Sequence, residues 1–249
     1  MLTPERHQLI LTILKEKHTV KINELVELTN SSESTIRRDL TQLEEEKHLK
    51  RIHGGAQRLQ GKLQEMSMTE KSTKNLQTKK SIAQFAANLV EEGDCIYLDA
   101  GSTIVEMIPF LPNGIVVVTN GLMHVAPLME KEIDLFLIGG HTKKKTGAVI
   151  GRGALLSLDQ YRFDKCFLGV NGIHSQYGFT TPDQEEAMVK QKALELSRET
   201  FVLADDSKFS EIAFAKIADL HKATIITNEL DPDTKEIYQS KTTIKVVTA

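Results

Sequence analysis

The sequence predicts an α/β protein in two parts: a small N-terminal bundle of three helices with a β wing, then a larger domain on a mostly parallel sheet. Over residues 4 to 46 the apolar residues recur with helical period. Beyond residue 79, short β-branched runs alternate with helical segments, which is typical of a parallel sheet covered by helices. The expected parts are residues 1–57, a linker over 58–76, and residues 77–249.

Composition excludes several classes of protein. The chain has 249 residues and a formal net charge of −3, as expected of an ordinary globular protein. No apolar run is long enough to cross a membrane, and the start MLTPERHQLI lacks the order of a secretory signal. Cys95 and Cys166 each lie in a short apolar run without metal-ligand spacing. We therefore expect a cytoplasmic protein with buried reduced thiols, no membrane partner, no metal and no cofactor.

Three apolar stripes predict the three short N-terminal helices. Pro4 suits a first helical turn, and the segment TNSS predicts a turn in which Ser31 or Ser32 caps the third helix. The following segment HLKRIHGGAQRL alternates polar and apolar residues around Gly54 and Gly55, which predicts a two-strand wing. The stripes are Leu9, Ile10, Ile13 and Leu14; Ile22, Leu25, Val26 and Leu28; and Ile36, Leu40 and Leu43. This combination is the pattern of a winged helix-turn-helix.

The third helix has an outward face suited to DNA. If residues 33 to 46 are helical, burial of the apolar stripe points Ser34, Arg38 and Thr41 outward, with Thr35 and Arg37 on the flanks. Hydroxyl residues and arginine near a helix N-terminus are the types that contact phosphates and guanine in the major groove. The alternative is an ordinary solvated face, since residues 1 to 57 hold nine basic and nine acidic side chains.

The wing supplies a second basic segment. Lys50, Arg51 and His53 precede Gly54 and Gly55, whose bare backbone can approach a phosphate at the edge of the minor groove. Three helices, a turn and a basic wing together favour a DNA interface over a solvated helix face.

In the larger part, one strand end suggests an anion site. The strand IYLD ends at Asp99, and Gly101, Ser102 and Thr103 follow at the start of an apolar helical run. Free backbone N–H groups, two hydroxyls and the positive end of a helix dipole form a suitable seat for a phosphate. The alternative is a simple helix cap.

Other expected strand ends carry similar residues. The carboxyl ends of parallel strands meet at one edge of a sheet, so these loops should converge on one crevice. They contain Thr119, Asn120, Gly139, Gly140, Asn171, Gly172 and Lys208. Lys208 is the candidate phosphate counter-ion, with an exposed loop lysine as the alternative.

Two further charged segments are ambiguous. Glu186 and Lys190 could contact a sugar hydroxyl, but their i, i+4 spacing fits a helix-surface ion pair, which is the preferred interpretation. The run Lys143 to Lys145 could touch phosphate or DNA, but a solvated charge run is the preferred interpretation.

The N-terminal segment resembles the winged helix-turn-helix of the DeoR family of bacterial sugar-operon regulators. The resemblance lies in Arg6, Ile10, Leu14 and the run SESTIRRDL over residues 32 to 40. It implies that DNA is contacted by Ser34, Thr35, Arg37, Arg38, Arg51, His53 and Gly54. Asp39 we interpret as structural, because a carboxylate facing DNA would be repelled, and Arg6 is its expected partner.

The rest of the chain resembles the effector domain of the same family, which is similar to sugar-phosphate isomerases. The matching segments are LDAGST, VVTNG, LIGG, LGVNGI, TTPDQEEAMVK and ADDSKF. In the isomerases the stretch matching LGVNGI is acidic, of the form DGADE, and belongs to the active site. Aldose–ketose isomerisation needs a carboxylate to move a proton, and this loop supplies none. We therefore expect a sensor with no catalytic residues.

Two alternatives remain at this point. An active isomerase or deaminase with an appended DNA-binding domain is kept open by Asp99, Glu186 and Asp205. An architectural DNA binder without an effector would leave the loops at the strand ends unexplained.

The resemblance implies a transcriptional regulator, which we expect to be a repressor that binds paired operator half-sites as a dimer or tetramer. A phosphorylated sugar would bind better to the form unsuited to DNA, and the linker would carry the change. The segments MLTPERHQLIL, EEGDCIYLDAGST and VVVTNGLMH resemble the Gram-positive fructose-operon regulators most, which implies fructose 1-phosphate as effector. The residues themselves support only a small anionic polyol, so tagatose, deoxyribose, glucitol and glucosamine phosphates stay open.

Overall fold

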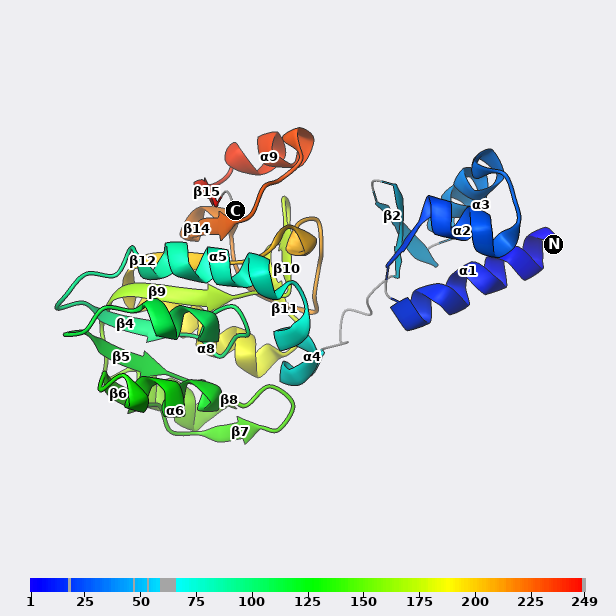
Figure 1. Cartoon of the computed structure of the whole chain (residues 1–249). Coiled ribbons are helices and arrows are strands. Elements are labelled where there is room, and N and C mark those ends of the chain that lie inside the picture. Colours follow the sequence, from blue (N-terminus) through cyan, green and yellow to red (C-terminus); the bar gives the residue numbers. More distant parts are fainter. Residues whose placement is uncertain (18, 47, 53, 59–65, 248–249) are drawn as a thin grey trace. The chain divides into compact units, whose positions relative to one another are not determined.

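The computed structural model describes residues 1–17, 19–46, 48–52, 54–58 and 66–247 of the chain. These residues form two compact units, 1–61 and 62–249, which are drawn in Figure 1. The segment expected to be a linker divides between them. Its residues 59–65 lie outside the described residues, and residues 66–76 belong to the second unit.

The first unit contains the three predicted helices. Its elements are α1 (Thr3–Lys17), β1 (Thr19–Lys21), α2 (Ile22–Thr29), α3 (Glu33–Glu45), β2 (Leu49–Ile52) and β3 (Gly55–Arg58). The three apolar stripes meet in one core around Ile10, Leu25, Ile36 and Leu40, except for Leu28, which is exposed because it points away from this core. Ser32 is the cap of α3, where its side-chain oxygen accepts a hydrogen bond from the backbone N–H of Thr35 at 3.3 Å.

The two predicted wing strands are β2 and β3, and a third described strand, β1, pairs with β3. Their order is β1-β3-β2, and both pairings are antiparallel. Strand β1 has only three residues and one buried side chain, Val20, which is too short for polar and apolar alternation to reveal. Gly55 is required by this third strand, since a Cβ there would lie 2.1 Å from the carbonyl oxygen of Val20.

The second unit is built on a seven-stranded sheet in which every pairing is parallel, so the predicted α/β class is confirmed. The order is β15-β14-β12-β9-β4-β5-β6. Cys95 and Cys166 lie in β4 and β9 as predicted; Cys166 is buried, whereas Cys95 is only partly buried. The strands are β4 (Cys95–Leu98), β5 (Val116–Thr119), β6 (Asp134–Leu137), β9 (Phe163–Gly169), β12 (Ser197–Leu203), β14 (Thr224–Thr227) and β15 (Ile244–Val246).

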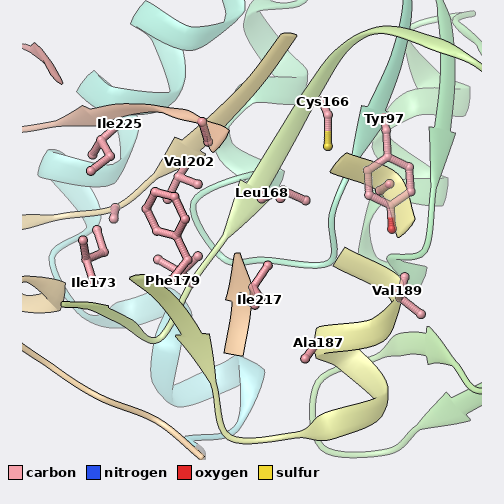
Figure 2. Close-up of a cluster of buried hydrophobic side chains, with 14 of the residues drawn as sticks. Tyr97, Cys166, Leu168, Ile173, Phe179, Ala187, Val189, Val202, Ile217 and Ile225 are labelled. Carbon is pink, nitrogen blue, oxygen red and sulfur yellow. The ribbon is translucent and has the colours of Figure 1, made fainter. Parts of the chain in front are cut away.

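Helices cover both faces of this sheet. On one face Ile96 and Leu98 of β4 pack with α5 (Leu76–Ala87), the 3₁₀ helix η1 (Val105–Phe110) and α6 (Leu122–Glu130). Tyr97 points to the other face, because side chains alternate along a strand. There it packs in the cluster that includes α7 (Arg152–Leu158) and α8 (Gln184–Glu195), part of which is drawn in Figure 2.

Smaller elements complete the second unit. Strands β7 (His141–Lys143) and β8 (Ala148–Ile150) form a hairpin, while β10 (Gly172–His174), β11 (Gly178–Thr181) and β13 (Ala215–Ala218) form a small antiparallel sheet. The remaining helices are α4 (Met68–Thr73), η2 (Asp206–Lys208), η3 (Leu220–Lys222) and α9 (Pro232–Gln239). Within the described ranges, no helix has the length and apolar character needed to cross a membrane.

The order of the strands places a ligand site. From β4 the chain moves outward to β5 and β6, and it then returns to the opposite side of β4 to form β9. The loops that leave the carboxyl ends of β4 and β9 therefore diverge. Parallel sheets bind ligands in the crevice that such a change of direction opens.

Candidate functional site

The outward face of α3 carries the residues expected to contact DNA. Ser34, Arg37 and Arg38 are exposed, and Thr35 and Thr41 are half-buried, while Ile36, Leu40 and Leu43 are buried beneath them. The hydroxyl oxygen of Ser32 lies 2.9 Å from that of Ser34 and 2.8 Å from that of Thr35. The amino-terminal turn of α3 therefore presents a group of hydroxyls next to two arginines.

The two arginines differ in their partners. Arg37 donates from Nε and Nη2 to Oε1 of Glu33 at 2.8 and 2.6 Å, one helical turn away. For Arg38, no hydrogen bond or ion pair to another described residue is present. Its guanidinium donors are thus available for a base or a phosphate, which makes Arg38 the stronger candidate for base contact.

The wing is tied to α3 through Arg51. Its Nη1 donates to the hydroxyl oxygen of Thr41 at 2.9 Å, and its backbone N–H donates to Oε1 of Glu44 at 2.7 Å. Gly54 is exposed with φ +75°, a left-handed conformation that favours glycine. His53 lies outside the described residues. Thr41 and Arg51, both expected at the DNA interface, therefore form one connected surface.

Asp39 is buried on the inner side of α3 and pairs with Arg6, as expected from the sequence. The hydrogen bond from Arg6 to Asp39 is the main cause that raises the pKa of the guanidinium. Burial alone would raise the pKa of Asp39, but hydrogen bonds from Arg6 and His7 hold it below its usual range. Asp39 therefore carries its charge inside the unit, away from the DNA-facing side chains.

A pocket lies over the carboxyl ends of β4, β9 and β12 in the second unit, where the change of strand direction predicts a ligand site. Its empty space amounts to about 750 Å³, a value that includes open solvent. Six of the twelve residues expected to bind the effector line it, namely Gly101, Ser102, Thr103, Asn171, Glu186 and Lys208.

Four lysines form one wall of this pocket: Lys71, Lys74, Lys79 and Lys208, which we call the lysine wall. Lys79 is only 6% exposed, and its ammonium donates to the backbone carbonyl of Lys71. Burial lowers the pKa of Lys79 and of Lys208; Asp205 opposes this, whereas the positive charge of Lys74 adds to it. A bound anion would offset the cost of these crowded and partly buried charges.

Hydroxyl and amide donors lie beside the lysine wall. Ser102 and Thr103 follow β4, and each is 9% exposed. Neither their hydroxyls nor their backbone N–H groups have a hydrogen-bond acceptor among the residues that the structure describes. The helical run expected here is a 3₁₀ helix containing Pro109. Lysines and unpaired donors together form a seat whose chemistry suits a phosphate.

Two buried carboxylates with cationic partners lie at the pocket, Glu186 in its lining and Asp99 beneath the lining. Asp99, 1% exposed, accepts from the ammonium of Lys190 and from the backbone N–H of Gly169 at 2.9 Å. Glu186 Oε1 accepts from Thr146 Oγ1 at 2.9 Å and from Lys143 Nζ at 3.1 Å. Burial raises the pKa of Asp99, although the neighbouring Lys190 charge opposes the shift.

These contacts correct two interpretations made from the sequence. A helix-surface ion pair between Glu186 and Lys190 is wrong, because both side chains are buried and bind other partners. Lys143 is also not part of a solvated charge run, since it forms ion pairs with Asp183 at 2.8 Å and with Glu186.

The structure does not bring the other six expected residues to the pocket lining. Strands β5 and β6 are one and two strands away from β4 on the side opposite β9, so the residues at their ends fall outside the crevice. These are Thr119, Asn120, Gly139 and Gly140, while Asp99 lies beneath the lining and Gly172 begins β10.

Several of these residues support the pocket from behind. Asn120 Oδ1 accepts from the backbone N–H of Ala100 at 2.7 Å and so holds the loop that carries Gly101. Thr119 Oγ1 donates to the carbonyl of Leu98 at 2.6 Å. A Cβ at Gly140 would lie 2.7 Å from the carbonyl oxygen of Ile150, and one at Gly172 would lie 2.5 Å from that of Glu211.

Sequence reasoning missed most of the lysine wall, although one signal was present. Lys79, Ile82, Ala83 and Ala86 share the buried face of α5 at positions i, i+3, i+4 and i+7. A lysine within an apolar stripe is rarely buried without a reason, so its position indicated a functional role. Lys71 and Lys74 carry no such signal, because they follow a polar segment that lacks a clear period.

An arginine-bearing winged helix-turn-helix and an α/β unit with a lysine-lined pocket together define a DNA-binding transcriptional regulator with a sensor domain. Residues 6–62 match the profile described as "DeoR-like helix-turn-helix domain", and residues 74–229 match "DeoR C terminal sensor domain". The chain belongs to the DeoR family of transcriptional regulators. The prediction that this chain is a DeoR-family regulator and not an enzyme is therefore confirmed.

Full-length relatives agree with this assignment. The chain is 56% identical over 249 residues to the HTH-type transcriptional regulator FruR of Bacillus subtilis, covering 99% of each chain. It is 33% identical over 237 residues to the lactose phosphotransferase system repressor of Staphylococcus epidermidis, covering 93% of this chain and 94% of that one. Among solved structures, ribose 5-phosphate isomerase A from Methanocaldococcus jannaschii matches 53% of each chain with 22% identity and a TM-score of 0.37.

Proposed function

We propose that this protein represses a bacterial sugar-utilisation operon in the cytoplasm and leaves its operator when a phosphorylated sugar binds the pocket. The observation that carries this proposal is the lysine wall beside Ser102 and Thr103, at the change of strand direction of a DeoR sensor domain. Fructose 1-phosphate is the favoured effector, because the chain is 56% identical to a regulator named FruR.

The operator would be bound by α3 and the wing. Ser34, Thr35 and Arg38 present the donors that read the major groove, and Arg37 and Arg51 would contact the backbone. Helix-turn-helix regulators usually read two half-sites about one helical turn of DNA apart, so we propose that the protein acts as a dimer or tetramer.

Helix α4 is suited to couple the two functions. It begins the described part of the second unit after residues 59–65, and none of its side chains is buried. One backbone hydrogen bond, from Met68 N–H to the carbonyl of Lys145 at 3.2 Å, connects it to the hairpin of β7 and β8. Lys71 on α4 and Lys74 just after it belong to the lysine wall.

A phosphate held by Lys79 and Lys208 would also attract Lys71 and Lys74, and so draw α4 toward the body of the sensor. In the ligand-free state the same lysines repel one another. Effector binding would thus change the position of the segment that leads to the DNA-binding unit. Such a differential interaction is what allows a ligand to shift a regulator between two states.

The decisive experiment is a fluorescence anisotropy titration of the full chain onto a labelled duplex from upstream of its own gene. The salt concentration must be fixed, because phosphate contacts dominate the affinity of proteins for DNA. We expect tight binding that millimolar fructose 1-phosphate weakens. Binding that no sugar phosphate alters would refute the effector proposal, and absence of specific binding would refute the operator assignment.

A further inference from the structure

Two hydrogen-bond networks meet in the pocket and share no residue. The first contains the lysine wall, where Lys79 donates to the carbonyl of Lys71 and Asn75 Nδ2 donates to Asp205 Oδ2 at 3.1 Å. The second contains Lys190, Asp99 and the backbone N–H of Gly169. Both networks reach the lining, so a ligand in the pocket can contact both at once.

The two networks differ in net charge. The lysine wall brings four ammonium groups to the lining, and Asp205 is the carboxylate that lines the pocket beside them. Beside the second network, Asp99 balances the charge of Lys190, and Lys143 is shared between Glu186 and Asp183. A dianionic phosphate is attracted to the first network. The second has no net positive charge that could attract another phosphate.

Lys190 nevertheless has donors to offer. A lysine ammonium has three N–H donors, and one of them is directed to Asp99. Lys190 lines the pocket although it is only 4% exposed. Gly101 and Gly169 line the pocket beside Asp99, and neither has a side chain that would fill the space.

We infer that Lys190, held in position by Asp99, recognises a hydroxyl oxygen of the sugar. The ligand is then a monophosphorylated polyol whose phosphate lies on the lysine wall and whose hydroxyl lies on Lys190. This inference rests on the proposed function, because it assumes that the lysine wall holds the phosphate. It also implies that a sugar bisphosphate binds more weakly than a monophosphate.

Calorimetric titration of the full chain can test this with inorganic phosphate, fructose 1-phosphate, fructose 6-phosphate, tagatose 6-phosphate, glucosamine 6-phosphate and fructose 1,6-bisphosphate as probes. Lys190→Gln should weaken the best monophosphate by about tenfold or more, as loss of a charged hydrogen bond does, and change inorganic phosphate by less than about twofold. Lys208→Gln should weaken both kinds of ligand. Lys192→Gln is the matched control, because Lys192 lies on the same helix and pairs with Asp159 outside the pocket.

Asp99→Asn provides a second variant in case Lys190→Gln does not fold. It keeps Lys190 and the shape of the site but removes the charge that positions the ammonium, so the same selective loss is expected. The inference is overturned if the variants leave sugar phosphates unaffected, or if they weaken inorganic phosphate by the same factor. It is also overturned if no monophosphate binds the unmodified chain better than inorganic phosphate or the bisphosphate. A chain that does not bind even inorganic phosphate would instead refute the proposed function.

Discussion

Arg6 donates two hydrogen bonds to Asp39 across 33 residues of sequence, from Nε to Oδ2 at 2.5 Å and from Nη2 to Oδ1 at 2.9 Å. Both side chains are buried, and His7 Nε2 adds a third contact to Asp39 Oδ1 at 3.2 Å. The pair joins α1 to the inner side of α3. It therefore fixes the orientation of the helix whose outer side carries Arg38.

Asp39→Ala should destabilise the DNA-binding unit by about 3 to 5 kcal/mol, because it leaves the Arg6 charge buried without a partner. Hydrogen exchange of the α1 and α3 peptides in the full chain measures this locally. Glu33→Ala is the matched control: it breaks the exposed pair with Arg37 and should cost about 0 to 1 kcal/mol. Equal exchange in the two variants would contradict a structural role for Asp39.

Arg38→Ala should weaken operator binding by about 1 to 3 kcal/mol and relax the preference at one base position, if Arg38 reads a base. Anisotropy with the operator and with point-mutated operators measures both effects. Arg198→Ala is the control, because Arg198 is an exposed arginine of the second unit that pairs with Asp164. A uniform loss on all sequences would instead assign Arg38 to the phosphate backbone.

Lys208→Ala should abolish the response to effector while leaving operator binding intact, because it removes one cation of the proposed phosphate seat and nothing from the DNA-binding unit. The measurement is the anisotropy titration with increasing fructose 1-phosphate. Lys216→Ala serves as control, since Lys216 is exposed and pairs with Asp219. A normal response of Lys208→Ala would show that the phosphate lies elsewhere.

The sequence predicted the elements that depend on residue patterns within one segment of the chain. Helical period revealed α1, α2 and α3, and the repulsion expected between a carboxylate and DNA indicated that Asp39 turns inward. Strand β1 escaped notice because three residues cannot display an alternating pattern. Arg6 was the expected partner because a carboxylate inside the bundle needs a cation, and the structure confirms the pair.

The pocket was predicted in outline but not in composition. Loops at the carboxyl ends of β4, β9 and β12 were expected to converge, and they do so. The ends of β5 and β6 were included wrongly in that convergence, because strand order cannot be read from strand sequence. Lys190 pairs with Asp99 across 91 residues, a contact that only the completed fold creates.

Stability should depend on pH through His124. This side chain is fully buried, its Nδ1 lies 2.8 Å from Thr119 Oγ1, and its Nε2 has no partner in the described part of the chain. Thr119 donates its own proton to Leu98, so His124 must donate from Nδ1, and a second proton on Nε2 would have no acceptor. Burial accordingly lowers the pKa of His124 from 6.5 to about 4.

At pH values between about 4 and 6.5, His124 binds a proton in the unfolded chain but not in the folded chain. The free energy of unfolding therefore falls as the pH falls. The free energy of unfolding should fall by about 2 kcal/mol from pH 7 to pH 5, because each pH unit below the unfolded pKa contributes about 1.36 kcal/mol. Urea unfolding followed by tyrosine fluorescence reports the second unit alone, because the chain has no tryptophan and its four tyrosines all follow residue 96. His124→Gln should remove most of this loss, whereas the exposed control His221→Gln should retain it.

Lys74→Glu should act as a partial substitute for the effector. Its carboxylate would attract Lys79 and Lys208, whose pKa values the Lys74 charge now lowers, and would draw the end of α4 toward the body of the sensor. We expect operator binding without effector to weaken by about tenfold, within the usual range of allosteric coupling, and the response to added effector to disappear. Lys74→Gln removes the charge without supplying an anion, so it should weaken effector binding yet keep full operator affinity. Anisotropy on the operator distinguishes the two variants. If Lys74→Glu binds the operator as tightly as Lys74→Gln, a change of charge at the lysine wall does not alter operator binding through α4.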